Sequence, residues 1–382
     1  MLIDIIAGAR PNFMKIAPII RALKAREAEG GILRYRLVHT GQHYDAKMSG
    51  DFFEQLGIPL PNVNLEVGSG TQAEQTGGIM IRYEALLLEK PSDLCLVVGD
   101  VTSTMACAIT AQKLHIPVAH VEAGIRSGDW SMPEEINRMV TDSITNWFFT
   151  TTVEADCNLL KVGIPDDRIF FVGNTMIDTL LANQDRLRAP DFWQDLNLNG
   201  KDYFVVTLHR PANVDEGTSF SKLLSAIAVG TRGLPVIFPV HPRTAKTLRE
   251  LRGFPSSIKL VDPQPYLEFN YMVKNALGVI TDSGGITEET TVMGVPCLTL
   301  RDTTERPETV TVGTNELIGT DPAKLTPALD RLFAGEWKKG AIPEKWDGNA
   351  AVRIIAQLET LLIGTTEQSA PLMTDINTPA NA

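Results

Sequence analysis

Short apolar runs alternate with amphipathic segments along nearly the whole chain. In the first half, the apolar runs are predicted to be strands at residues 2–7, 36–40, 94–99, 117–123, 147–151 and 169–173. Segments with helical periodicity, such as IAPIIRALKAREAE and TGGIMIRYEALLLE, lie between them. Apolar strands separated by helices indicate a parallel sheet that is covered by helices on both faces.

The alternation breaks once, at the polar interval 186–202, and then begins again. The second series of strands is predicted at residues 203–209, 235–241, 258–262, 277–283 and 296–301. We therefore expect an α/β protein with two doubly wound, Rossmann-like domains, at residues 1–186 and 202–348. Residues 349–364 are expected to form a last helix that packs back on the first domain, and the polar tail 365–382 is expected to be disordered.

Length and composition agree with two domains and argue against several function classes. The 382 residues are 43% hydrophobic and 21% charged, as in ordinary globular proteins. The net charge of −11 argues against a surface that binds nucleic acid or anionic membranes. No run reaches transmembrane length, and the start MLIDIIAGARP lacks the basic segment of a signal peptide. We expect a cytoplasmic protein.

The four cysteines, Cys95, Cys107, Cys157 and Cys297, are widely spaced and form no CxxC pair. Three of them lie in apolar runs. The pattern therefore favours buried thiols over a disulfide framework or a zinc site.

Residues able to bind anions or transfer protons follow nearly every predicted strand. Ligands of open parallel sheets bind beyond the carboxyl ends of the strands, so these positions are candidates for a site. They are Gly8, Arg10 and Lys15 in GARPNFMK, Asp100 in GDVTST, Glu122 in HVEAG, His209 in HRPANVD, His241 in HPRT, the segment SGGITEE (283–289) and Arg306 in RDTTERPE. Their number predicts a cleft between two facing sheets.

The segment SGGITEE has a mechanical interpretation. Gly284 and Gly285 let backbone N–H groups approach an anion at the positive N-terminus of the following helix. Glu289 lies about one turn inside, where a carboxylate can accept hydrogen bonds from ribose hydroxyls. A glycine turn before a helix with acidic residues in its first turn explains the same letters, and this motif alone favours that explanation.

The remaining candidates also have structural explanations. Arg10 and Arg306 offer the planar forks that phosphate oxygens favour, but a single arginine is more often in a surface ion pair. His209 and His241 follow apolar strands and could equally be structural. Asp100 could cap a helix, although the neighbouring Thr102 and Ser103 could also serve as caps.

The stretch HVEAGIRSGDWSMPEEINR gathers acids and arginines where a strand gives way to a helix. Pro133, Glu134 and Glu135 are typical of a helix start. That explanation does not extend to Glu122 at the edge of a buried strand, where an unpaired carboxylate would be costly. Arg126 and Arg138 lie on either side of the loop and could orient the carboxylates.

Taken together, GARPNFMKIAPIIRAL, VVGDVTST, HVEAGIRSGD, PEEINR, TDSGGITEE and RDTTERPETVTVGTN resemble the non-hydrolysing UDP-N-acetylglucosamine 2-epimerase family, collinearly from residue 1 to about residue 363. The resemblance implies the GT-B arrangement, in which two Rossmann-like domains enclose a cleft. It also implies a homodimer and a reaction that uses no metal and no nicotinamide cofactor.

The resemblance implies a specific reaction. The C2 proton is removed while UDP leaves C1, which gives 2-acetamidoglucal, and UDP adds back after C2 is reprotonated from the opposite face. Such inversion needs acid/base groups on both faces and cations beside the departing diphosphate.

The resemblance also assigns roles to individual residues. Asp100, Glu122 and Glu134 match the acid/base carboxylates, and His209 matches a catalytic or phosphate-contacting imidazole. Which carboxylate serves which face stays open. The substrate-binding positions are Arg10 and Lys15 near the phosphates, Ser283, Gly284 and Gly285 as the diphosphate cradle, Glu289 at the ribose, Gln264 and Phe269 at the uracil, Arg306 as a further substrate contact, and Arg138 as support for the carboxylates.

Two segments depart from the well-known bacterial members. TGQHYDAKMSGDFF replaces the segment that forms their activating second sugar-nucleotide site. Gln42 and His43 are retained, and the sequence leaves open whether an allosteric second site exists around them. HRPANVD replaces an HRRE-like segment. TGQxYD also occurs in relatives that epimerise UDP-2,3-diacetamido-2,3-dideoxyglucuronic acid. Four alternatives remain: an epimerase that acts on that sugar nucleotide, a hydrolysing epimerase, a GT-B glycosyltransferase and a non-catalytic nucleotide-sugar sensor.

Overall fold

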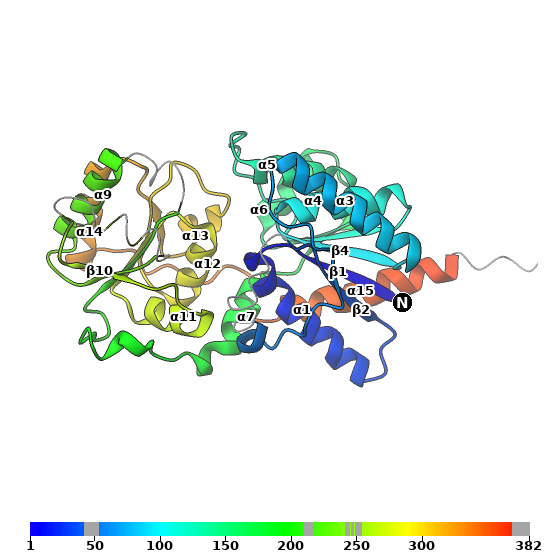
Figure 1. Cartoon of the computed structure of the whole chain (residues 1–382), viewed down its shortest axis with the longest axis horizontal. Helices are drawn as coiled ribbons and strands as arrows, with labels where there is room; N and C mark the ends of the chain where they lie inside the picture. The colour runs from blue at the N-terminus through cyan, green and yellow to red at the C-terminus, as the bar shows by residue number, and fades with distance from the viewer. Residues whose placement is uncertain (42–52, 210–216, 241–244, 246–247, 249–253, 369–382) are drawn as a thin grey trace, which may run out of the picture.

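The structure is a computed structural model that describes residues 1–41, 53–209, 217–240, 245, 248 and 254–368. Two α/β domains lie side by side in Figure 1, with helices α7 and α12 where they meet. Each domain has a parallel sheet, so the predicted architecture of two Rossmann-like domains in GT-B arrangement is confirmed.

The first domain contains a sheet of seven strands among the described residues, in the order β3-β2-β1-β4-β5-β6-β7. The strands are β1 (Leu2–Ala7), β2 (Arg34–His39), β3 (Val63–Asn64), β4 (Leu94–Val98), β5 (Val118–Val121), β6 (Trp147–Thr150) and β7 (Ile169–Phe171). The helices are α1 (Arg10–Ala28), α3 (Gln72–Glu89), α4 (Thr102–Lys113), α5 (Pro133–Ile144), α6 (Val153–Lys161) and α7 (Thr175–Asn183).

Apolar side chains cover both faces of this sheet. Ile5 and Leu96 pack in a cluster with α1 and the last helix, α15 (Ala350–Gln368), whereas Ile6 and Val97 pack with α3 and α4. Because neighbouring strand residues point to opposite faces, a strand buried on both sides must be apolar throughout. This requirement explains why these strands could be predicted from the sequence.

The second domain has six strands in its described part, in the order β10-β9-β8-β11-β12-β13. They are β8 (Phe204–Thr207), β9 (Val236–Pro239), β10 (Ile258–Val261), β11 (Gly278–Thr281), β12 (Cys297–Thr299) and β13 (Asn315–Leu317). The helices are α9 (Gly217–Gly230), α11 (Tyr266–Asn275), α12 (Gly284–Met293), α13 (Pro307–Thr311) and α14 (Leu325–Phe333). Short 3-10 turns occur at Asp166–Arg168, Gln184–Arg186, Asp191–Trp193 and Pro322–Lys324.

Several strands differ from their predicted ranges. Strands β4 and β5 end before the predicted residues 99 and 123, because Gly99 and Glu122 take positive φ angles of 66° and 72° and turn the chain. The edge strands β3 and β13 were not predicted, since they have two and three residues and include polar side chains.

Two further predictions concern the state of the cysteines and the absence of a membrane-spanning run. Cys95, Cys107 and Cys297 are buried free thiols, as predicted, and Cys157 is exposed. Among the described residues, no helix is both long enough and apolar enough to cross a bilayer.

Helix α15 returns the chain to the first domain. Its Ile354, Ile355 and Leu358 pack in the cluster that includes residues of α1, and Glu359 pairs with Arg26 at 2.8 Å. Figure 1 shows the helix beside α1, far from the rest of the second domain. The helix runs to Gln368, so residues 365–368 are helical rather than disordered; residues 369–382 lie outside the described residues.

The carboxylate of Asp178 in α7 caps the start of α15. Its oxygens accept hydrogen bonds from the N–H groups of Ala350 and Ala351, at 3.1 and 2.7 Å. The first N–H groups of a helix have no partner within the helix and need such an acceptor.

We expect Asp178→Ala to lower the free energy of unfolding by about 1–2 kcal/mol, because it removes this cap. Urea denaturation of the full chain measures the change. The control is Asp185→Ala, which alters an exposed aspartate nearby and should change stability by less than about 0.5 kcal/mol. Equal effects of the two substitutions would contradict a capping role.

Candidate active site

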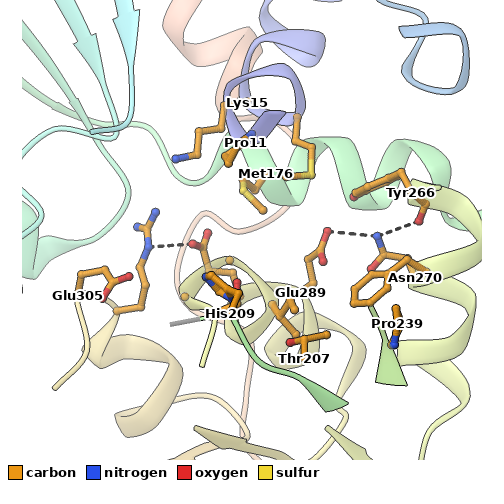
Figure 2. Close-up of a pocket in the computed structure, with 18 of the residues that line it drawn as sticks. Pro11, Lys15, Met176, Thr207, His209, Pro239, Tyr266, Asn270, Glu289 and Glu305 are labelled. Atoms are coloured by element: carbon orange, nitrogen blue, oxygen red, sulfur yellow. Dashed lines mark hydrogen bonds and ion pairs between the residues drawn. The ribbon is translucent and has the colours of Figure 1, made fainter. Parts of the chain in front are cut away.

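A cavity of about 590 Å³ lies between the domains, beyond the carboxyl ends of strands from both sheets (Figure 2). The first domain lines it with Pro11, Met14, Lys15, Asp100, Glu122 and Met176. The second domain lines it with Thr207, His209, Pro239, Pro263, Gln264, Tyr266, Phe269, Asn270, Ser283, Gly284, Gly285, Ile286, Glu288, Glu289, Glu305 and Arg306. The cavity is large enough for a small-molecule ligand.

Most of the candidate residues named from the sequence meet in this cavity. Those that line it are Lys15, Asp100, Glu122, His209, Gln264, Phe269, Ser283, Gly284, Gly285, Glu289 and Arg306. Arg138 reaches it indirectly, through Asp100. The side chain of Arg10 and the residues Gln42, His43 and His241 lie outside the described part of the chain.

Glu122 is the most constrained carboxylate of the cavity. It follows β5 with a φ of +72°, a conformation that costs a glutamate free energy, and its side chain is buried. The carboxylate is 2.5 Å from the Lys15 Nζ and also pairs with Arg306. Burial opposes ionisation, but Arg306 and Lys15 outweigh it and hold the pKa of Glu122 below its ordinary value.

Arg306 connects the two domains beside Glu122 in this cavity. It belongs to the second domain, yet its guanidinium pairs with Glu122 and donates to Thr151 Oγ1 at 2.9 Å in the first. Its Nε lies 2.9 Å from Glu288, whose carboxylate also accepts from Asn174. Burial raises the pKa of Glu288, although Arg306 opposes that shift.

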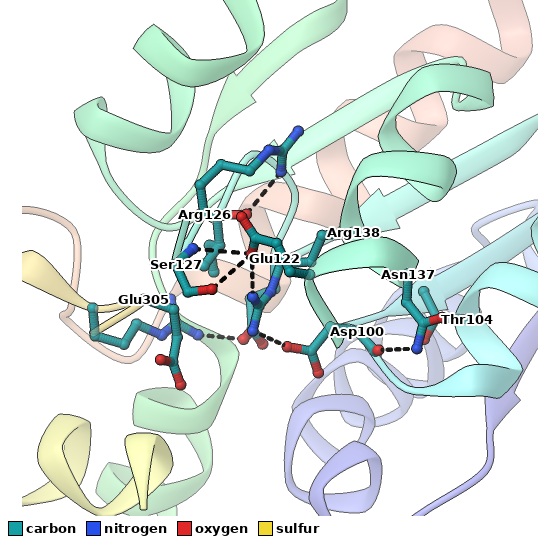
Figure 3. A network of polar contacts seen from close by, with 12 residues as sticks. Asp100, Thr104, Glu122, Arg126, Ser127, Asn137, Arg138 and Glu305 are labelled. Carbon is teal, nitrogen blue, oxygen red and sulfur yellow. Dashed lines mark hydrogen bonds and ion pairs between the residues drawn. The ribbon is translucent and has the colours of Figure 1, made fainter. Parts of the chain in front are cut away.

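Asp100 belongs to a second network of polar contacts, which connects the loop before α5 to that helix (Figure 3). Arg138 binds Asp100 at 2.5 Å and Glu135 at 2.6 Å. Glu135 also accepts from the N–H groups of Ser127 and Gly128, each at 3.0 Å. Arg138 therefore holds the Asp100 carboxylate in place, and its support of a catalytic role remains a prediction.

The two acids that begin α5 differ in burial and in contacts, and neither lines the cavity. Glu135, which was assigned only to the helix start, is buried and holds the loop. Glu134 is half-buried and is not among the residues that line the cavity. The side chain at the third helical position turns back over the loop, whereas the one before it projects elsewhere. Arg126 binds Asp142 at 2.6 Å and does not contact Glu122.

His209 enters the cavity from the end of β8. Its Nδ1 lies 2.8 Å from the buried carboxylate of Asp282, which also accepts from the His209 backbone N–H at 3.1 Å. The ring is 62% exposed, so a ligand can reach it. A carboxylate at Nδ1 fixes the ring orientation and supports a proton at that nitrogen.

Helix α12 brings its N-terminus to the cavity. Ser283 precedes the helix, and Gly284 and Gly285 open it, so their backbone N–H groups face an end of positive potential. An ideal Cβ on Gly284 would lie 2.4 Å from an oxygen of Glu305, so the backbone and that side chain are closely packed. The geometry suits a phosphate or another anion.

Glu289 lines the other half of the cavity, beside Tyr266 and Asn270. The Asn270 amide donates to its carboxylate at 3.3 Å. Burial raises the pKa of Glu289 to about 7, although hydrogen bonds from Tyr266 and Asn270 oppose the shift.

Several lining residues were not singled out in the sequence. Glu288 stands next to Glu289 in SGGITEE, and the adjacent letters gave no reason to choose both. Tyr266 and Asn270 are four residues apart in α11, and this helical spacing was the available signal. Met176, Thr207 and Glu305 reach the cavity only through the packing of the two domains.

The raised pKa of Glu289 predicts a pH-dependent contribution to stability. Between about pH 4.5 and 7 the unfolded chain releases this proton and the folded chain keeps it, so stability falls as pH rises through that window. Glu289→Gln should remove the contribution, which amounts to about 3 kcal/mol above pH 7. Urea denaturation from pH 5 to 8 measures it; a constant difference between variant and wild type would contradict the assignment.

Known proteins resemble this chain in sequence and in fold. The family model for UDP-N-acetylglucosamine 2-epimerase matches residues 24–359. The UDP-N-acetylglucosamine 2-epimerase of Methanocaldococcus jannaschii is 43% identical over 346 residues, 87% of this chain and 92% of that protein. The UDP-2,3-diacetamido-2,3-dideoxy-D-glucuronate 2-epimerase of Pseudomonas aeruginosa is 39% identical, over 84% of this chain and 88% of that protein.

Solved structures agree. The crystal structure of the M. jannaschii UDP-GlcNAc 2-epimerase in complex with UDP-GlcNAc and UDP has a TM-score of 0.81 at 42% identity, covering 94% of this chain and 100% of that one. The UDP-GlcNAc 2-epimerase of Neisseria meningitidis bound to UDP-GlcNAc has a TM-score of 0.84 at 28% identity, covering 94% and 100%. By sequence and by fold, the chain belongs to the UDP-N-acetylglucosamine 2-epimerase family.

Proposed function

We propose that this protein interconverts UDP-N-acetylglucosamine and UDP-N-acetylmannosamine without hydrolysis. As a member of an epimerase family, it is an isomerase. The observation that carries the proposal is the ionised Glu122, held between Lys15 and Arg306 in a cavity that faces the N-terminus of α12. Carboxylate, cations and anion site are the groups that elimination of a diphosphate requires.

The two halves of the cavity divide the work. Ser283, Gly284 and Gly285 hold the diphosphate, and Glu289 accepts hydrogen bonds from the ribose. Gln264 and Phe269 contact the uracil. The sugar then points at the first domain, where Asp100 and Glu122 line the cavity and Arg138 supports Asp100. No metal enters this scheme.

Elimination starts with transfer of the C2 proton to a carboxylate. The electron pair of the C2–H bond forms the C1–C2 double bond, and the C1–O bond breaks with its pair on the diphosphate. Lys15, Arg306 and His209 stabilise the departing charge. In the return step a second acid protonates C2 from the opposite face, and a UDP oxygen forms the new bond to C1.

The ion pairs of Glu122 suggest how substrate binding activates it. A carboxylate that two cations neutralise is a weak base. A bound diphosphate competes for Lys15 and Arg306, and a weaker hold on Glu122 raises its basicity. The base is then strongest when the substrate is present.

The diacetamido uronic acid nucleotide is a second candidate substrate, because the P. aeruginosa relative is 39% identical to this chain. The TGQHYD segment is compatible with that choice. A homodimer and a role for Glu134 remain predictions.

Incubation of the purified protein with UDP-N-acetylglucosamine in deuterium oxide tests the reaction. We expect UDP-N-acetylmannosamine carrying deuterium at C2, detected by NMR and mass spectrometry. Free N-acetylmannosamine that accumulates in step with UDP would indicate hydrolysis. Turnover of the diacetamido uronic acid nucleotide alone would change the substrate, and binding with neither exchange nor turnover would indicate a sensor.

A second prediction concerns Glu122. Glu122→Gln should reduce deuterium exchange by roughly 10²- to 10⁴-fold, because it removes an acid/base group. The affinity for UDP should be retained or increase, since UDP contacts mainly the second domain and its diphosphate no longer competes with Glu122 for Lys15 and Arg306; calorimetry measures it. The control is Glu89→Gln on the exposed end of α3. Normal epimerisation by Glu122→Gln would refute the role of this residue.

A further inference from the structure

His120 is a fully buried histidine behind the cavity, in strand β5. Its Nε2 lies 2.8 Å from the carbonyl oxygen of Gly99. Its Nδ1 lies 2.8 Å from Asp142 Oδ1, a carboxylate oxygen of helix α5. Both ring nitrogens are thus in hydrogen-bond contact with groups from other elements, although the ring does not line the cavity.

The partners of His120 determine where its protons lie. A carbonyl oxygen only accepts, so Nε2 must donate. Asp142 is ionised: its Oδ2 accepts from Arg126 at 2.6 Å and from the Gly124 N–H at 3.2 Å. Burial opposes this ionisation, but His120 and Arg126 keep the pKa of Asp142 below its ordinary value. An ionised carboxylate at Nδ1 accepts from a second N–H, so both ring nitrogens are in position to donate.

The two contacts reach the backbone turns that carry the cavity carboxylates. Gly99 immediately precedes Asp100, and Gly124 comes two residues after Glu122. Gly99, Glu122 and Gly124 have φ angles of +66°, +72° and +78°. A glutamate in the left-handed region persists only where its surroundings hold it, and His120 with Asp142 ties both turns to α5.

We propose that His120, as a buried imidazolium, is a positioning residue that holds the turns bearing Asp100 and Glu122 in their relative places. This inference rests on the proposed function, in which those two carboxylates are the acid/base groups. In the described part of the chain, the charged group that contacts the His120–Asp142 pair is Arg126 from the loop, and the turn after β4 contributes the Gly99 carbonyl.

The protonation state can be tested without any substrate. Histidine-selective ¹⁵N NMR of the full-length protein at neutral pH should show one histidine with protons on both ring nitrogens, absent from His120→Gln. Asp142→Asn should convert it to a neutral ring. The Asn amide can then donate to Nδ1 while its oxygen accepts from Arg126 and Gly124, so that every hydrogen bond survives. A neutral His120 in the wild type would overturn the imidazolium.

The positioning role is tested by kinetics with the same variants. His120→Gln loses at least one of the two contacts, and we expect kcat for epimerisation to fall roughly 10- to 100-fold, as small displacements of catalytic groups do. The Kd for UDP should stay within about twofold. Asp142→Asn should keep kcat within about threefold of the wild type, since its hydrogen bonds are preserved. The control is His115→Asn, an exposed histidine of the same domain.

Three results would overturn positioning: an unchanged kcat in His120→Gln, a parallel loss of kcat, UDP affinity and thermal stability, or an equal loss of kcat in Asp142→Asn. The thermal unfolding temperature of each variant identifies the second case. If His120→Gln does not fold, the kinetics and NMR of Asp142→Asn decide. Failure of the wild type to turn over either UDP-sugar would overturn the proposed function instead, and the NMR result would stand apart from it.

Discussion

The ion pair between Arg306 and Glu122 is the contact on which the site depends. A guanidinium buried this deeply needs carboxylates around it, and Arg306 pairs with Glu122 of the first domain and with Glu288 and Glu308 of the second. The ion pair between Arg306 and Glu122 therefore exists only when the two domains meet. It keeps Glu122 ionised, and it places a cation where a departing diphosphate would need one.

Around this contact the polar groups form two separate layers. At the cavity surface, Lys15 and Arg306 both pair with Glu122, and Arg306 also pairs with Glu288. Behind them, Arg138 with Glu135 and His120 with Asp142 hold the backbone from which Asp100 and Glu122 project. The strained turn at Glu122 is thus supported from both sides. Its left-handed φ angle is a cost that this packing offsets.

The prediction of the site was uneven for a physical reason. Residues immediately after strands, such as Asp100, Glu122 and His209, could be found because parallel strands end at a common edge. Glu134 and Glu135 could not be told apart, since adjacent helical residues diverge by about 100° and only the loop decides which one turns back. That Glu288 and Glu305 line the cavity became visible only once the two domains were packed together.

By itself, the sequence determined the alternation of buried strands and helices, the two-domain organisation and the edge at which polar residues gather, because each depends on local periodicity and burial. The family motifs added the identity of most lining residues. The tertiary structure alone decided which charges pair, that Arg306 crosses between the domains, and that His120 is enclosed by acceptors. These depend on distances between segments far apart in the chain, and local patterns do not encode such distances.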